Sequence, residues 1–131
     1  MIKRIGMSGF KSWRSTDAVS FGPITALFGT NSSGKTSFLQ LLLLLKQTVE
    51  AADRSLVLNL GDESSLVELG TFHELVHRHD LDIPLRWDVD WALPKRLRVE
   101  DPSKRKEILF EGSELGFSAE VAWKRNGEGL G

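Results

Sequence analysis

The segment with the clearest chemical meaning is GTNSSGKT at residues 29–36. It fits the pattern G-x-x-x-x-G-K-[S/T], in which Gly29 and Gly34 let the backbone close tightly around a phosphate group. Lys35 would neutralise charge on the β- and γ-phosphates, and the Thr36 hydroxyl would be a ligand of Mg²⁺. The segment therefore predicts binding of ATP or a related nucleotide together with Mg²⁺.

Backbone amides of this loop are expected to carry most of the phosphate contacts. A helix beginning near Gly34 would add its positive end and its unpaired N–H groups to them. The predicted nucleotide-binding residues of the loop are Asn31, Ser32, Ser33, Gly34, Lys35, Thr36 and Ser37.

The elements around the loop must position it. An apolar run at residues 24–28 predicts a buried central strand before the loop, and strong helix formers at 36–52 predict a helix after it. Consecutive leucines at 41–45 cover every side of that helix, which predicts burial between layers. With short strands expected at 2–5 and 18–21, the predicted fold class is α/β. It is the N-terminal lobe of a P-loop NTPase, a mixed sheet around one long buried helix with additional antiparallel strands.

The second part of the chain has the pattern of strands. Short strands are predicted at residues 56–58 and 66–69, and alternation of apolar and polar residues predicts longer antiparallel strands at 83–91 and 115–123. A basic stretch at 95–106 is interpreted as a solvated loop between them, because acidic residues interrupt it.

Composition and length set further limits. The chain has 131 residues, no cysteine, a formal net charge of −1 and no long apolar run. These features exclude disulfides and predict a cytoplasmic protein without a membrane segment. We expect a single domain over 1–131, with a P-loop core at 1–54 and a mainly antiparallel lobe at 55–131. The hairpin signal Asn126-Gly127 lacks an evident return strand, so we interpret the chain as the N-terminal fragment of a larger ATPase.

A family resemblance strengthens the nucleotide hypothesis. Residues 10–13 (FKSW) followed by residues 21–40 resemble the opening of the ABC-type head ATPases of SMC, RecF and overcoming-lysogenisation (OLD) proteins. The leucine-rich helix and residues 67–77 resemble a bacterial AAA-type ATPase subgroup, many of whose members are linked to phage defence. The resemblance covers roughly residues 1–80 and is strongest at 10–45.

This resemblance implies properties that the residues alone do not. It implies a Walker A ATPase that hydrolyses ATP between two heads, and therefore a homodimer of ATPase heads, with nucleic acid as a partner in some relatives. It places Lys11 and Ser12 where the family's early loop touches the nucleotide; the alternative for both is a plain solvated hairpin turn. For Trp13, base stacking and core packing both stay open.

The same family also has elements that we do not find here. It carries a glutamine on a strand after the P-loop helix, whereas Gln40 and Gln47 fall on the helix itself. It carries a signature motif and an Asp-Glu pair after four apolar residues, and Asp62-Glu63 matches that pair poorly. We therefore expect nucleotide binding without hydrolysis by this chain alone, and no catalytic residue is assigned. A scaffold module with a structural nucleotide is an alternative.

A competing motif lies at residues 73–77, where His73-Glu74-Leu75-Val76-His77 satisfies H-E-x-x-H. On one helix its two histidines could bind zinc and Glu74 could act as a general base. Because no distant third ligand follows and the flanks allow only about two helical turns, we favour a short structural helix over a zinc metallohydrolase. Adventitious metal binding by His73, His77 and His79 is the intermediate possibility.

Overall fold

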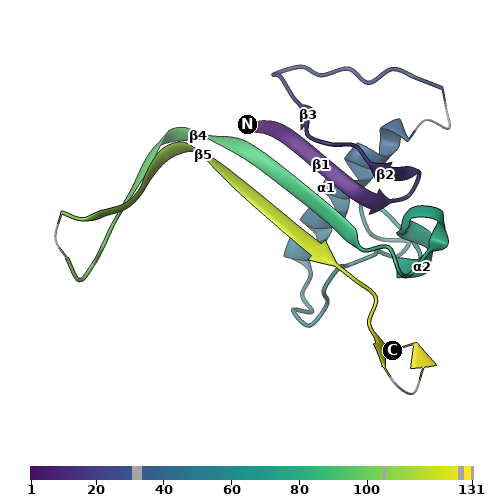
Figure 1. The fold of residues 1–131 in the computed structure, drawn as a ribbon. Coiled ribbons are helices and arrows are strands. Elements are labelled where there is room, and N and C mark those ends of the chain that lie inside the picture. Colours follow the sequence, from purple (N-terminus) through teal and green to yellow (C-terminus); the bar gives the residue numbers. More distant parts are fainter. Residues whose placement is uncertain (31–33, 105, 127–128, 131) are drawn as a thin grey trace.

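The chain folds into a curled antiparallel sheet with one long helix against it (Figure 1). The computed structural model describes residues 1–30, 34–104, 106–126 and 129–130. The strands are β1 (Ile2–Phe10), β2 (Trp13–Ser15), β3 (Val19–Ser20), β4 (Leu85–Glu100), β5 (Ile108–Val121), β6 (Arg125–Asn126) and β7 (Gly129–Leu130). The helical elements are α1 (Lys35–Glu50), α2 (Phe72–Leu75) and the 3₁₀ turn η1 (His77–His79).

Strand order in the main sheet is β2-β1-β4-β5, and β3 pairs with β1 on the same edge as β2. Every pairing is antiparallel; Ile5, for example, lies opposite Val89. β4 and β5 form one hairpin whose far end continues beyond the sheet as a two-stranded arm (Figure 1). β1 is thus flanked on both edges and is the centre of the folded body.

The hydrophobic core lies between one face of this sheet and α1. A fully buried aliphatic or aromatic side chain contributes roughly 1.5–3 kcal/mol to folding. The opposite face carries polar and charged residues, among them Arg4 and Asp90, which form an ion pair of 2.9 Å. The buried hydrophobic residues are Ile5, Met7, Phe10, Phe38, Leu41, Leu44, Leu69, Leu75, Val76, Leu85 and Trp87.

The predicted fold class is wrong. We expected an α/β P-loop NTPase lobe with a mixed sheet around a P-loop strand, whereas the sheet is antiparallel throughout and residues 24–28 form no strand. Ile24 and Phe28 are 93% and 91% exposed. The physical reason is pairing: β4 occupies one edge of β1 and β2 with β3 occupies the other, so no edge of the central strand is open to this run.

The helix also differs from its prediction. It begins at Lys35, as the sequence indicates, but it is buried on one face and not on all sides. Leu39 is 59% exposed and Val49 is 69% exposed, because the described chain provides a single layer for the helix to pack on. The buried positions are Ser37, Phe38, Leu41, Leu44 and Gln47.

The other predicted elements are partly confirmed and partly corrected. Strands predicted at 2–5, 18–21, 83–91 and 115–123 are confirmed. The basic stretch is not simply a loop, because residues up to Glu100 belong to β4.

The expectation of a missing return strand is also wrong, since β6 pairs with β7. In the described part of the chain no helix has the length and apolar character to cross a membrane.

Predicted strands at 56–58 and 66–69 are irregular instead, and Gln47 gives the reason. Its side-chain amide donates to the carbonyls of Asn59 (2.6 Å) and Val67 (3.1 Å), and its oxygen accepts from the N–H of Val67 (3.1 Å). Backbone groups that pair with a side chain are not free for a β-ladder. The amide of one helical residue therefore fixes this connection against α1.

We predict that Gln47→Ala lowers the free energy of unfolding by about 2 kcal/mol, because it leaves part-buried backbone groups of Asn59 and Val67 without partners. The matched control is Gln40→Ala, since Gln40 lies on the same helix and makes no hydrogen bond to a described residue. Urea denaturation followed by tryptophan fluorescence measures both variants. Equal midpoints for the two would contradict the role of Gln47.

Candidate functional site

The described part of the phosphate loop is its junction with α1. Asn31, Ser32 and Ser33 lie outside the described residues. Gly34 is the N-cap of α1 with φ 83° and ψ 15°, in the left-handed region. A Cβ at this position would overlap Ser12 Oγ and lie 2.5 Å from Trp13 Nε1, so both the conformation and the space require glycine.

Lys35 is the first residue of α1, and its side chain turns back onto the loop. The ammonium group donates to the carbonyl of Gly29 and, at 3.1 Å, to the carbonyl of Thr30. Its positive charge is therefore held beside the loop by neutral acceptors. A phosphate group would be a stronger acceptor for the same donor.

The remaining loop residues differ in access. Thr36 is exposed, and its hydroxyl makes no hydrogen bond to a described residue. Ser37 is 4% exposed, and its N–H donates to the carbonyl of Gly34 at 3.1 Å. Thr36 can thus reach a ligand or a metal ion with its side chain, whereas the buried Ser37 side chain cannot.

The β1–β2 hairpin lies directly against this junction. The indole N–H of Trp13 donates to the carbonyl of Gly34 at 3.0 Å, and its ring packs edge-to-face on Phe38 with 6.1 Å between centroids. Ser12 lies close to the junction, since a Cβ at Gly34 would overlap its Oγ. The backbone of Lys11 is bonded to another segment, since its N–H donates to the carbonyl of Leu75 at 2.7 Å.

A pocket of ≈ 270 Å³ opens beside the Lys35 side chain. Aromatic and aliphatic side chains dominate its walls, which suit a planar, uncharged ring next to a cation. Sequence reasoning did not find this pocket, because its residues come from three separate segments without a motif. The lining residues are Trp13, Thr16, Val19, Leu27, Phe28, Lys35 and Phe38.

The H-E-x-x-H segment does not form one helix. α2 ends at Leu75, and His77 begins the separate turn η1, so the two histidines of the motif are not carried on one helical face. His77 Nδ1 lies 2.8 Å from the carbonyl of Lys11, and His73 stacks on His79 at 5.2 Å between centroids. Within the described residues no group of three metal-binding side chains occurs.

Glu74 has a structural role in this segment. Its carboxylate accepts from the N–H of Thr71 at 2.6 Å, and the Thr71 hydroxyl accepts from the N–H of Glu74, which is a capping box for α2. The hydrogen bond from Thr71 lowers the pKa of Glu74. A carboxylate with a lowered pKa is a weaker base, so the capping role opposes general-base chemistry.

The weak Asp-Glu candidate at residues 62–63 is also engaged in local structure. Asp62 accepts hydrogen bonds from the Ser64 hydroxyl at 2.7 Å, from the N–H of Ser64 at 2.9 Å and from the Ser65 hydroxyl at 3.1 Å, and these lower its pKa. The segment is irregular and not an apolar strand. It does not have the context of a metal-holding pair.

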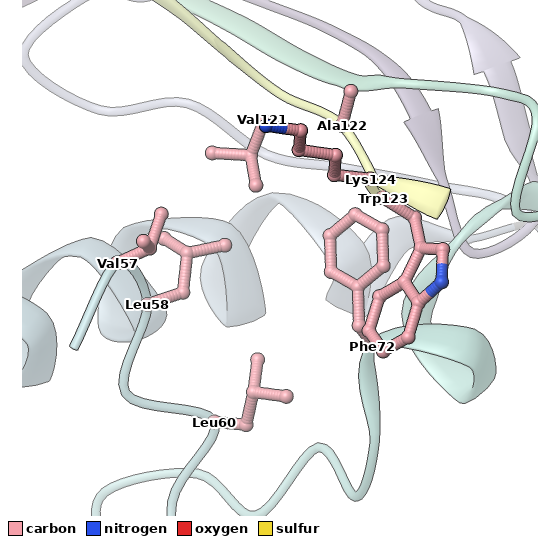
Figure 2. Close-up of a pocket in the computed structure, with 8 residues that line it drawn as sticks. All are labelled: Val57, Leu58, Leu60, Phe72, Val121, Ala122, Trp123 and Lys124. Atoms are coloured by element: carbon pink, nitrogen blue, oxygen red, sulfur yellow. The ribbon is translucent and has the colours of Figure 1, made fainter. Parts of the chain in front are cut away.

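A further pocket of ≈ 310 Å³ lies where the end of β5 meets α2 (Figure 2). Phe72 and Trp123 stack in its wall with 6.0 Å between ring centroids, and the other side chains are mainly aliphatic. Lys124 is its one ionisable lining residue. Apart from Lys124, the lining side chains offer apolar contact without an acid, base or nucleophile.

Comparison with models of known families, with curated proteins and with solved structures gives no match. The functional argument therefore rests on this chain's own geometry. The features that it uses are the left-handed Gly34, the Lys35 ammonium beside the loop, the exposed Thr36 hydroxyl and the adjoining pocket.

We predict that Gly34→Ala destabilises the fold by about 1–2 kcal/mol or more, because alanine is strained in the left-handed region and its methyl group would displace Ser12 or Trp13. Gly22→Ala is the control, since a Cβ at Gly22 would have ordinary contacts with Ile24 O at 3.6 Å. Equilibrium denaturation compares the two. A Gly34→Ala variant as stable as the Gly22→Ala variant would refute this account of the junction.

Proposed function

We propose that this chain binds ATP–Mg²⁺ through the Walker A segment at residues 29–36, as part of an SMC/RecF/OLD-like ATPase. The observation that carries the proposal is the position of Lys35. Its ammonium group is held beside the loop by carbonyl oxygens at the start of α1, and the N-cap is a left-handed glycine. In this proposal the helix start, the lysine ammonium and the amides of the loop hold one anion together.

Binding would exchange the lysine's partners. When phosphate oxygens replace the carbonyls of Gly29 and Thr30, hydrogen bonds from the cation to neutral oxygens become hydrogen bonds between opposite charges, which adds Coulomb attraction. The Thr36 hydroxyl is free to enter the coordination shell of Mg²⁺, whose remaining positions would be filled by phosphate oxygens and water. In this proposal Thr36 is the single side chain of the described residues that holds the metal ion.

The nucleoside would occupy the pocket beside Lys35. Phe28 is 91% exposed at its edge and Trp13 lies in its wall, so a base would cover apolar surface that is otherwise open to water. Trp13 would contribute packing more than free stacking, because its N–H and one ring edge are engaged by Gly34 and Phe38. Ser12 would lie at the phosphate end of the site.

The wider role follows from the resemblance. A pair of ATPase heads with nucleotide between them, a cytoplasmic location and a nucleic-acid partner belong to this proposal as its broader setting. The absence of cysteine suits a reducing compartment.

We predict that Lys35→Ala weakens binding of ATP–Mg²⁺ at least about tenfold, since a charge-assisted contact to phosphate contributes about 1.5–3 kcal/mol. Lys46→Ala is the matched control, because Lys46 is exposed near the other end of the same helix and has no partner among the described residues. Isothermal titration calorimetry with and without Mg²⁺ measures each variant. Unchanged affinity in Lys35→Ala would contradict the proposed nucleotide site at residues 29–36.

We also predict that the chain releases phosphate from ATP far more slowly than the roughly 1 s⁻¹ at the low end of enzyme turnover. Phosphoryl transfer needs a positioned water and a metal ion held from both sides, and the two acidic candidates Asp62 and Glu74 are occupied by local hydrogen bonds. The assay is phosphate release at saturating ATP–Mg²⁺. Turnover near 1 s⁻¹ that Lys35→Ala abolishes would exclude the scaffold alternative, and replacement of Glu63 and Glu74 would then identify the catalytic group.

A further inference from the structure

We propose that the chain has a second anion site, which binds a phosphate monoester on the other side of the β1–β2 hairpin from the nucleotide pocket. The site is a pocket of ≈ 510 Å³ whose walls include Arg14, His77 and Arg78. This volume lies within the roughly 300–1,000 Å³ typical of small-molecule sites. It is also larger than the pocket beside Lys35.

The two pockets are separate because they use opposite faces of β2. Trp13 and Arg14 are neighbours in that strand, and successive side chains of a strand point to opposite faces. Trp13 packs on Phe38 and lines the pocket beside Lys35, whereas Arg14 lines the larger pocket. The pockets have no lining residue in common.

Two arginines without a partner are the observation that points to an anion. Among the arginines that the structure describes, Arg14 and Arg78 alone make no hydrogen bond or ion pair with a described residue. Both line this same pocket. Both residues are exposed, and an anion in this pocket would be attracted by two guanidinium groups that have no other partner among the described residues.

The other charges at the pocket are largely neutralised. Arg86 pairs with Glu120, and Asp82 pairs with Arg125 at 3.1 Å. Asp80 is the remaining carboxylate of the wall, and it accepts the N–H of Asp82 at 2.9 Å. Two unpaired cations and one carboxylate leave the wall with a net positive charge, which favours an anionic ligand.

The backbone of the turn that carries Arg78 is strained and is tied to the β1–β2 hairpin. Arg78 and His79 both have left-handed backbone angles, with φ of 56° and 54°, which are strained for residues other than glycine. Such strain persists where the surroundings impose it, and it is concentrated at ligand sites. The contact of His77 Nδ1 with the carbonyl of Lys11 ties the turn to the hairpin and leaves Nε2 without a partner among the described residues.

The chemistry of these groups selects a phosphate monoester. Each guanidinium offers a planar fork of donors that matches two phosphate oxygens, and His77 Nε2 can add a further contact. A monoester carries nearly two charges and three terminal oxygens, which exceed what a carboxylate offers. The remaining volume can accept a sugar, so the source is either a free sugar phosphate or the 5′-phosphate end of a nucleic-acid strand.

The test uses ribose 5-phosphate, with ribose as its uncharged counterpart, in a calorimetric titration of the whole chain. We expect binding of ribose 5-phosphate, no binding of ribose, and at least about tenfold weaker binding in Arg14→Gln/Arg78→Gln. The charge-matched control is Lys46→Gln/Arg54→Gln, since Lys46 lies in the last turns of α1 and Arg54 follows the helix and bonds to the carbonyl of Val49. Lys35→Ala should leave this binding unchanged, which separates the second site from the proposed nucleotide site.

A second arm distinguishes the two sources of the phosphate. A tetranucleotide with a 5′-phosphate and the same strand with a 5′-hydroxyl are titrated in parallel. Tighter binding of the 5′-phosphorylated strand than of ribose 5-phosphate assigns the site to strand ends, and weaker binding assigns it to free sugar phosphates. Equal binding of both strands would show contact with the backbone instead of the monoester and would overturn the proposal.

Three further results would overturn it. They are absence of saturation with ribose 5-phosphate, unchanged affinity in the double arginine variant, and loss of binding in Lys35→Ala. Because the double variant could unfold, the parent chain is also treated with phenylglyoxal and analysed by mass spectrometry. Ribose 5-phosphate should protect Arg14 and Arg78 from modification and leave Arg54 reactive; equal reactivity of all three would refute the site.

Discussion

The hydrogen bond from the Trp13 indole to the carbonyl of Gly34 is the contact on which the candidate site depends. It joins the β1–β2 hairpin to the first turn of α1, and Phe38 packs on the same indole. The Gly34 carbonyl also accepts the N–H of Ser37, so one backbone oxygen ties hairpin and helix together. Because Gly34 has no Cβ, Ser12 and the indole can approach the backbone closely enough for this arrangement.

In the two proposals, this one hairpin serves two separate ligands. β2 presents Trp13 to the helix and Arg14 to the opposite side, and the strand period of two keeps the two environments apart. The turn of the hairpin is held by the segment that contains α2 and η1. The N–H of Lys11 donates to the carbonyl of Leu75, and the carbonyl of Lys11 is in contact with His77 Nδ1. A displacement of this turn would therefore move both pockets, although they share no lining residue.

Sequence patterns predicted what is decided locally. The alternation that buries Leu85 and Trp87 is visible in the sequence, and so is the helix start at Lys35. The apolar run at 24–28 was predicted as a central strand because its composition suits one, but pairing depends on which neighbouring edges are open, and those of β1 are taken. The short strands before residue 70 failed for another non-local reason, since Gln47 binds the backbone that they would have used.

The two candidate sites also differ in whether local sequence is enough to find them. A loop with fixed spacing between Gly29 and Lys35 can be found in a sequence, because the residues that are proposed to bind phosphate are neighbours along the chain. Arg14 and Arg78 are far apart in sequence, and only the topology brings them to one pocket. The formal net charge of −1 does not reveal these two arginines either. It counts every charged residue equally, whether or not the residue is in an ion pair such as Arg4–Asp90 or Arg125–Asp82. What marks the second site is therefore not how many cations the chain has, but which of them the fold leaves without a partner.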